Sequence, residues 1–386
     1  MITMKNLFVM AVMIIVTIIT TTTTEAKFAD RKIFVSKLSG VHKSLSDLET
    51  IRTAIRKGAL SNLAALPQDI KTELLKHAET SLKKSHYPTK TVTDFMEYFR
   101  DGNRNHYERK LGQHRERVTV LTVGHLLDRA VNSSSTRFLD EIVNGVWFLC
   151  EESTWALPAH LYLQKTGDHN LPTPGGRPAI DLGAGEVGKF LAWIKLLLGH
   201  DFDRSVSPVV NRRIDYEFRQ RLFEPFLKID DFFWEGFNDR GHVVNNWNIW
   251  VNGNILKAAV FTLNSTAHHD DLLFNKVLNK TLYSADYFLD GYGEDGGCDE
   301  GPAYWRQAGG RLIEYLESLD QLFPVVAKTY FSGIPLLRKI GEYAYKMRIT
   351  GNWFVNFADA IPRISYPPSL LYQYGLLFNG KLDTFL

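Results

Sequence analysis

The stretch Ile249-Trp-Val-Asn-Gly-Asn-Ile-Leu-Lys-Ala-Ala-Val-Phe-Thr-Leu263 carries apolar residues at intervals of three and four. This spacing lines one face of an α-helix and is typical of a helix packed on a core. Strand-like alternation is scarce, so we expect an all-α fold, a closed array of helical hairpins rather than a regular solenoid. The same spacing recurs, between connections rich in Gly, Pro, Asp and Asn, in segments 45–55, 70–82, 118–131, 138–149, 187–198, 214–226, 272–288, 312–322 and 334–347.

An asparagine cluster lies at the start of this stretch, with five asparagines and two tryptophans in the ten residues that begin at Asn245. Asparagine disfavours helix interiors because its amide competes for backbone hydrogen bonds. One explanation is structural, with Asn245 as an N-cap and the other amides in a polar network between helices. The other is functional: Asn245, Asn248 and Asn252 would share a helix face as donors for an oxygen-rich ligand. His242 would then approach Asn246, provided that this turn is helical.

A second unusual segment is the glycine-broken acidic loop Asp290-Gly-Tyr-Gly-Glu-Asp-Gly-Gly-Cys-Asp-Glu-Gly-Pro-Ala-Tyr-Trp-Arg306. Ordering it is entropically unfavourable and buries little apolar surface, so folding alone explains it poorly. Pro302 is suited to the first position of a helix. Tyr304 and Arg306 then fall in the first turn, where unpaired N–H groups favour anions. This position makes Tyr304 a candidate for proton transfer.

The N-terminal residues predict a secretory signal peptide. Lys5 precedes an apolar run from Leu7 to Ile19, and Ala26 is a suitable small residue at the cleavage site. The run is too short to cross a bilayer comfortably, although an uncleaved anchor is the alternative. We therefore expect a signal peptide over residues 1–26, one helical domain over residues 27–386, and a secreted or periplasmic protein.

Composition narrows the classes of function. The net charge is only +2, with basic residues spread along the chain, which argues against a nucleic-acid binder. Aromatic residues make up 12% of the chain and suit a large core or stacking on sugar rings. Cys150 and Cys298 could form one disulfide or stay as two buried thiols. No phosphate-binding loop, zinc-ligand spacing or nucleophile elbow is present, so we expect no metal and no other cofactor.

Five segments resemble the helical domain of the heparinase II/III-like polysaccharide lyases, which include relatives of alginate and heparin lyases. The resemblance extends from about residue 90 to the end, and Trp-x-x-Pro-x-His and Glu-Gly-Pro-x-Tyr-Trp are its most specific parts. It implies an (α/α) toroid that binds an acidic polysaccharide and cleaves it beside a uronate by β-elimination. The toroid would be incomplete, without the family's C-terminal β-sandwich in this chain. The segments are Cys150-Glu-Glu-Ser-Thr-Trp-Ala-Leu-Pro-Ala-His160, Ile180-Asp-Leu182, Asn245-Asn-Trp-Asn248, Asp295-Gly-Gly-Cys-Asp-Glu-Gly-Pro-Ala-Tyr-Trp305 and Asn356-Phe-Ala-Asp359.

The resemblance also implies roles for single residues. Tyr304 matches the family's catalytic tyrosine, and Asn246 matches the asparagine that neutralises the uronate carboxyl. In several of these lyases a histidine base follows that asparagine, but Trp247 stands there in this chain. The histidine role is therefore empty or has moved to His242. The candidate substrate-binding residues are Asn245, Trp247, Asn248, Trp155, His160, Glu300 and Arg306.

Other interpretations stay open at this stage. Tyr304 could be a core aromatic, and His160 and His242 could be hydrogen-bonded structural histidines. A glycoside hydrolase on a similar toroid would use two carboxylates of the acidic loop as acid and base. A third possibility is a helical domain that keeps the substrate groove of these lyases and binds a glycan without cleaving it. The carboxylates in question are Glu294, Asp295, Asp299 and Glu300.

Overall fold

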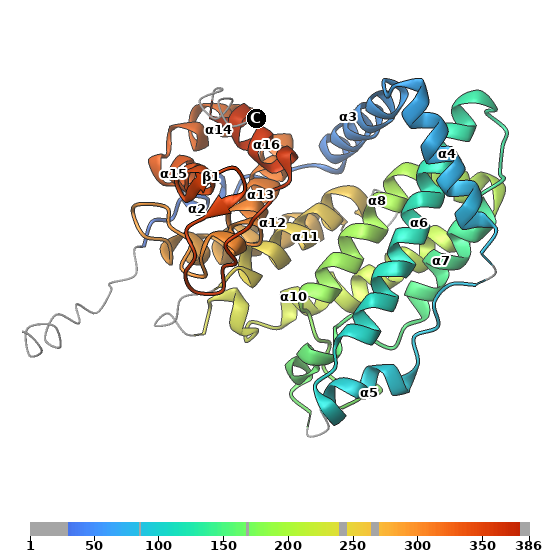
Figure 1. The fold of residues 1–386 in the computed structure, drawn as a ribbon, viewed down its shortest axis with the longest axis horizontal. Helices are drawn as coiled ribbons and strands as arrows, with labels where there is room; N and C mark the ends of the chain where they lie inside the picture. Colours follow the sequence, from blue (N-terminus) through green and yellow to red (C-terminus); the bar gives the residue numbers. More distant parts are fainter. Residues whose placement is uncertain (1–29, 85, 167–169, 239–244, 264–269, 379–386) are drawn as a thin grey trace, which may run out of the picture.

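The protein is mainly helical in the computed structural model (Figure 1), which confirms the expected all-α class. Within the described residues the one sheet is a two-stranded antiparallel hairpin of β1 (Arg348–Thr350) and β2 (Trp353–Phe354). No helix of the described part is long and apolar enough to cross a membrane. The predicted signal peptide and His242 lie outside the residues that the structure describes, which are 30–84, 86–166, 170–238, 245–263 and 270–378.

All ten segments predicted as helices are helical. The sequence patterns missed α5, the polar first half of α6, α14 and α16. The α-helices are α2 (Val35–Leu38), α3 (Leu45–Ala64), α4 (Gln68–Leu82), α5 (Val92–Asp101), α6 (Asn105–Val131), α7 (Leu139–Glu151), α8 (Leu182–Ser205), α9 (Pro208–Phe218), α10 (Glu224–Lys228), α11 (Trp247–Thr262), α12 (Asp270–Asp290), α13 (Gly309–Leu322), α14 (Pro324–Thr329), α15 (Pro335–Lys346) and α16 (Pro368–Leu377). Short 3₁₀ turns form η1 (Pro158–Gln164), η3 (Phe233–Glu235), η4 (Pro302–Arg306) and η5 (Phe331–Gly333), and η2 (Arg219–Phe223) is a π-helical turn.

Side-chain caps set where several helices begin. Ser44 and Asp47 form a reciprocal capping box at α3, and Thr91 and Asp94 form another at α5. Asp181 caps α8 by accepting a hydrogen bond from the Ala184 N–H. These caps satisfy backbone donors that the first turn of a helix leaves unpaired.

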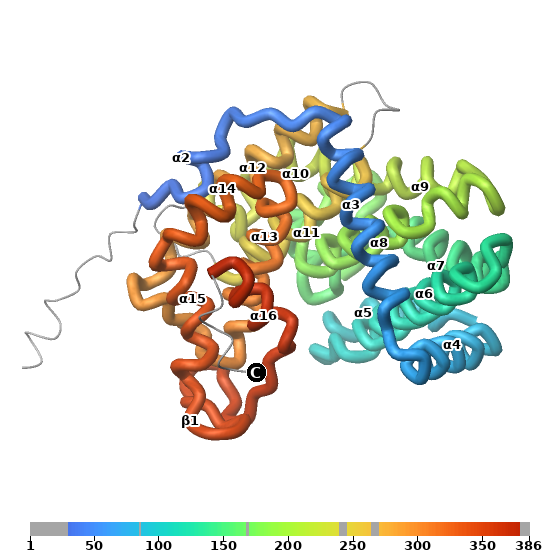
Figure 2. The backbone as a smooth tube through the Cα atoms, turned by 90° about the horizontal axis from the view of Figure 1, so that it is seen from above, coloured from blue at the N-terminus to red at the C-terminus, as the bar shows by residue number. Residues whose placement is uncertain are grey.

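Helix α11 lies at the centre of the fold. Nearly all of its residues are buried, because it packs against α8, α12 and α13. A helix that is apolar on most sides is expected at such a central position. Figures 1 and 2 show α4 to α9 on one side of it and α12 to α16 on the other. The long helix α3 crosses between the two sides and contacts α6, α8, α11 and α13.

The two cysteines are buried free thiols, which decides between the two alternatives left open by the sequence. Cys150 is on α7, and Cys298 is in the acidic loop before η4. Burial raises the pKa of each thiol to about 12. Both side chains therefore stay protonated at neutral pH and act as small apolar core residues.

Candidate active site

Asn246 and Glu300 meet although they are 54 residues apart in the chain. The Asn246 Nδ2 donates a hydrogen bond to the Glu300 Oε2 over 2.6 Å. Asn246 immediately precedes α11 and is only 5% exposed. Its amide is therefore held against a carboxylate at a nearly dry position, where such a bond is stronger than in water.

Asn245, the residue before, has a structural role. Its side-chain Oδ1 accepts a hydrogen bond from the Trp247 N–H over 3.1 Å, and its carbonyl accepts one from the Asn248 N–H. Asn245 is itself exposed. Its Oδ1 thus satisfies a backbone donor in the first turn of α11, as the capping interpretation predicts, and this fixes the direction in which Asn246 projects.

Two glycines bend the acidic loop so that Glu300 reaches Asn246. Gly296 and Gly301 have φ angles of +75° and +89°, which residues with a Cβ atom rarely adopt. A Cβ on Gly301 would stand 2.4 Å from the Phe357 carbonyl oxygen. The Asp359 N–H also donates to the Glu300 carbonyl over 3.2 Å. The 357–359 segment therefore supports the loop, and Asp359 joins the site through it.

Tyr304 follows Glu300 on η4, where its N–H donates to the Gly301 carbonyl over 3.1 Å. Its side chain is half-buried against the main core. Its neighbour Trp305 is fully buried and donates from its indole Nε1 to the Ile340 carbonyl over 2.7 Å. Anchoring of the adjacent residue fixes the backbone from which Tyr304 projects.

The prediction of a helix that starts at Pro302 is confirmed for its first residue and wrong for its type and length. Pro302 does occupy the first position of a helix, but η4 is a 3₁₀ turn of five residues. The chain leaves it at Ala308, and α13 starts separately at Gly309. The break falls at Ala308, whose φ of −104° and ψ of −83° lie outside the α-helical region. The anion-favouring dipole of a long helix is therefore not available to Tyr304.

Burial and neighbouring charges raise the pKa of Glu300. Burial has the largest effect, and the carboxylates of Asp359 and Asp299 act in the same direction. The hydrogen bond from Asn246 opposes them by stabilising the charged form. A carboxyl with a raised pKa retains its proton to higher pH, so Glu300 is suited to donate a proton or to tolerate a nearby anion.

A second pair of residues lies beside this contact. The His160 Nδ1 is 2.7 Å from the Asp181 Oδ2, and the His160 ring packs edge-on against Trp247 at 4.4 Å between centroids. Asp181 is fully buried and also accepts from the Leu157 N–H over 3.0 Å. Pairing with a carboxylate favours the tautomer that carries hydrogen on Nδ1 and leaves Nε2 as an acceptor. His160 is therefore oriented as a base would be.

Several residues predicted to bind substrate are buried and make structural hydrogen bonds instead. Trp155 is 3% exposed, and its Nε1 donates to the Leu149 carbonyl over 2.8 Å. Asn248 is fully buried, and its Nδ2 donates to the Trp234 carbonyl and to Ser284. The predicted donor face is corrected accordingly, because α11 turns Asn248 and Asn252 into the protein.

The remaining predicted residues are near the surface. Arg306 is exposed at the end of η4. Trp247 is half-buried and lies between His160 and Phe233. Of the candidate carboxylates, Glu294 is 81% exposed and paired with Arg31 over 2.8 Å. Asp295 is exposed as well, and its Oδ1 accepts from the Gly297 N–H.

Sequence patterns missed two members of this site, Asp181 as the partner of His160 and Asp359 as a neighbour of Glu300. Both stand in segments that carry the lyase resemblance. No protein-family model matches the chain, and no curated protein matches it in sequence. The resemblance therefore stays a prediction, and the argument for function rests on the geometry of these residues.

Proposed function

We propose that the protein is a secreted polysaccharide lyase that cleaves a uronate-containing acidic polysaccharide on an (α/α) toroid. The observation that carries this proposal is the Asn246 amide, which is already bonded to a carboxylate, with Tyr304 four residues beyond that carboxylate. In the proposed complex the uronate carboxyl takes the place of Glu300 on the amide. The row of helical hairpins and the short loops between them support the toroid.

The proposed reaction is a β-elimination and consumes no water. A base removes the C5 proton, a double bond forms between C4 and C5, and the bond from C4 to the leaving oxygen breaks. That oxygen takes up a proton. Tyr304 can transfer both protons when the C5 hydrogen and the leaving oxygen lie on one face of the sugar. Asn246 stabilises the negative charge that spreads onto the carboxyl, an effect that grows in the transition state.

The histidine that would follow Asn246 in several lyases is replaced by Trp247, but His160 lies against that tryptophan. We propose His160 as a second proton carrier, held by Asp181 from a different segment of the chain. Glu300, Asp299 and Asp359 oppose an anionic substrate. The raised pKa of Glu300 lessens this repulsion, since a protonated carboxyl carries no charge.

The test is the absorbance of an unsaturated uronate at the new chain end. Purified protein is incubated with alginate, heparin, heparan sulfate and hyaluronan, and ultraviolet absorbance and chain length are followed together. We expect at least one polymer to shorten as absorbance rises. Shortening without the chromophore would refute the lyase and identify hydrolysis.

The glycoside hydrolase is the second candidate, and the raised pKa of Glu300 beside Asp359 favours it. Glu300 would act as the acid and Asp359 or Asp299 as the base. Reducing ends without ultraviolet absorbance, on acidic or neutral polymers, would support this function. Binding with no new chain ends on any polymer would support the glycan-binding domain.

A further inference from the structure

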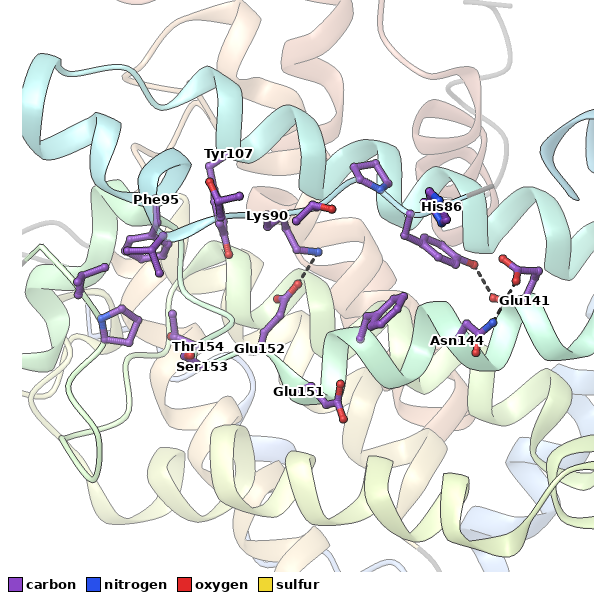
Figure 3. A pocket seen from close by; sticks show the side chains of 18 residues that line it. His86, Lys90, Phe95, Tyr107, Glu141, Asn144, Glu151, Glu152, Ser153 and Thr154 are labelled. Atoms are coloured by element: carbon purple, nitrogen blue, oxygen red, sulfur yellow. Dashed lines mark hydrogen bonds and ion pairs between the residues drawn. The ribbon is translucent and has the colours of Figure 1, made fainter. Parts of the chain in front are cut away.

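A cavity of about 620 Å³ lies between segment 86–92 and the end of α7, and Asn246, Glu300 and Tyr304 are not among the residues that line it. Figure 3 shows Lys90 and Tyr107 projecting from one side toward Glu152, Ser153 and Thr154 on the other. The volume is within the range of small-ligand sites. A neighbouring hollow of about 440 Å³ shares Ser153 and Thr154 with it, which extends the cavity along the surface.

Fixed interactions hold the walls of this cavity. Lys90 and Glu152, with side chains 9% and 12% exposed, form an ion pair over 2.5 Å. The Lys90 Nζ also lies 3.2 Å from the Nδ1 of the buried His114. On the same wall the Tyr87 hydroxyl donates to the Glu141 carbonyl over 2.6 Å. Such a cross-linked wall is preformed, so a ligand need not order it.

The lining combines ring faces with uncharged hydrogen-bonding groups. Phe148 is 48% exposed and Phe95 forms part of the opposite wall, while Asn144, Ser153 and Thr154 supply donors and acceptors. Sugar rings present apolar C–H faces to aromatic side chains and hydroxyls to polar groups at their edges. Both kinds of contact are available in this cavity.

Tyr107 provides a free polar group inside the cavity. It is 7% exposed and packs edge-on against Phe95 at 5.1 Å. Figure 3 draws no hydrogen bond between its hydroxyl and the other residues that line the cavity, whereas buried tyrosines usually have a partner. Burial raises its pKa, so the hydroxyl keeps its proton and can donate.

The charges of the lining argue against an anionic ligand. Lys90, the one lysine among the described residues that line the cavity, is already paired with Glu152, and Glu141 is paired with Arg117 over 2.8 Å. Glu151 is exposed at the rim and would repel a carboxylate or a sulfate. The cavity therefore favours an uncharged ligand, whereas the Asn246 amide bonds a carboxylate.

We propose that this cavity is a second sugar-binding site, which takes one uncharged pyranose ring and plays no part in bond cleavage. The ring stacks on Phe148 and accepts a hydrogen bond from the Tyr107 hydroxyl. The inference does not rest on the proposed lyase activity, because it concerns binding alone. If the protein also acts as a lyase, this cavity binds a neutral sugar unit of the substrate at a place separate from the site of cleavage.

Saturation-transfer NMR on the full chain tests this site. The neutral probes are N-acetylglucosamine and the methyl glycosides of glucose, galactose and mannose, and glucuronic acid is the acidic probe. We expect at least one neutral probe to bind with a millimolar dissociation constant. No signal from any neutral probe, or a weaker glucuronic acid signal in Phe148→Ala than in the unchanged protein, would overturn the proposal, because glucuronic acid bound at Asn246 would not respond to that variant.

Substitutions in the cavity test whether the neutral sugar binds there. Tyr107→Phe removes one hydroxyl and Phe148→Ala removes an exposed ring, and each should weaken the neutral probe about two- to tenfold. Tyr372→Ala is the matched control, since Tyr372 is 53% exposed on α16 and outside the cavity. Circular dichroism checks that each variant is folded. Unchanged affinity in Phe148→Ala, which alters an exposed residue, would show that the sugar binds elsewhere.

Discussion

Two asparagines at the start of α11, Asn246 and Asn248, make contacts of different kinds. Asn246, just before the helix, directs its amide to Glu300 on a separate loop, whereas Asn248 buries its amide against the Trp234 carbonyl and Ser284. Both residues are nearly inaccessible, with exposed fractions of 5% and 0%. The difference is the partner: Asn246 bonds a titratable side chain, which in the proposed complex gives way to a ligand carboxyl, while Asn248 bonds mainly backbone carbonyls. Only the first is suited to chemistry.

The largest effect should come from Tyr304→Phe, which keeps the ring and removes the proposed proton carrier, four residues after Glu300 in the chain. Removing a general acid–base group typically lowers a rate by about 10²- to 10⁴-fold, and a tyrosine that serves both transfers should fall at the upper end. The rate of chromophore formation measures the effect, with folding checked by circular dichroism. If a folded Tyr304→Phe protein keeps most of its lyase activity, the tyrosine has no role and the carboxylates become the better candidates.

A matched pair of substitutions tests the comparison directly. Asn246→Ala removes a donor to the reacting carboxyl and should reduce the rate about 10²- to 10³-fold, with a smaller change in KM. Asn248→Ala leaves buried backbone acceptors without a partner and should lower the free energy of unfolding by about 1–3 kcal/mol per lost partner. Lyase rates and urea unfolding of both variants provide the two measurements. The distinction fails if Asn248→Ala, while folded, is the variant with the larger loss of rate.

The double variant Asn246→Ala, Tyr304→Phe sharpens the same result. Because both residues serve one chemical step, its rate should be far less impaired than the product of the two single effects predicts. Multiplicative losses would mean that the two residues act in separate steps.

Glu300→Gln tests whether the partner of Asn246 is itself a reacting group. In the lyase, glutamine still accepts the Asn246 hydrogen bond and removes a charge that repels the uronate, so KM should fall about two- to fivefold with little change in kcat. In the hydrolase, the loss of the acid should abolish activity. Steady-state kinetics on the best polymer separates the two, and a large fall in kcat would favour the hydrolase.

The buried side of the comparison predicts a pH dependence of stability. Glu235 is fully buried beside the Asn248 network, its Lys280 partner lies 3.0 Å away, and burial raises its pKa to about 8. In the unfolded chain this carboxyl has its ordinary pKa of 4.5, so folding takes up a proton at pH values between 4.5 and 8. This contribution to stability is complete below pH 4.5 and is lost as the pH rises through 8.

Glu235→Gln should therefore flatten the loss of stability between pH 5 and pH 8.5, by an amount on the order of 2–4 kcal/mol. Urea unfolding at several pH values measures it. Glu294→Gln is the control, because Glu294 is exposed and Arg31 lowers its pKa, so it does not titrate in this range. A similar slope in Glu235→Gln and in the unchanged protein would show that Glu235 ionises freely in the folded state.

The sequence was sufficient to predict the helices that have an apolar stripe. It missed α5 (Val92–Asp101) and α16 (Pro368–Leu377), which are short, and the first half of α6, where polar residues conceal the period. Caps were also predictable, because Asp181 bonds a backbone N–H only three residues ahead. These features follow from interactions within a few residues of the chain, which the order of residues specifies directly.

The sequence singled out residues of the candidate site, but it did not predict the contacts between them. The sequence indicated Asn246, Glu300 and Tyr304, and gave no sign that Asn246 bonds Glu300 or that His160 bonds Asp181. It also placed Trp155 among the substrate-binding residues, whereas the fold buries that side chain.

Thus the sequence by itself determined that the chain is helical and where most helices begin and end. The tertiary structure decided which polar residues face one another. The physical reason is range: periodicity and capping act over three or four residues, while the contact of Asn246 with Glu300 spans 54 and exists only after Gly301 fits against the Phe357 carbonyl and α11 is buried among its neighbours.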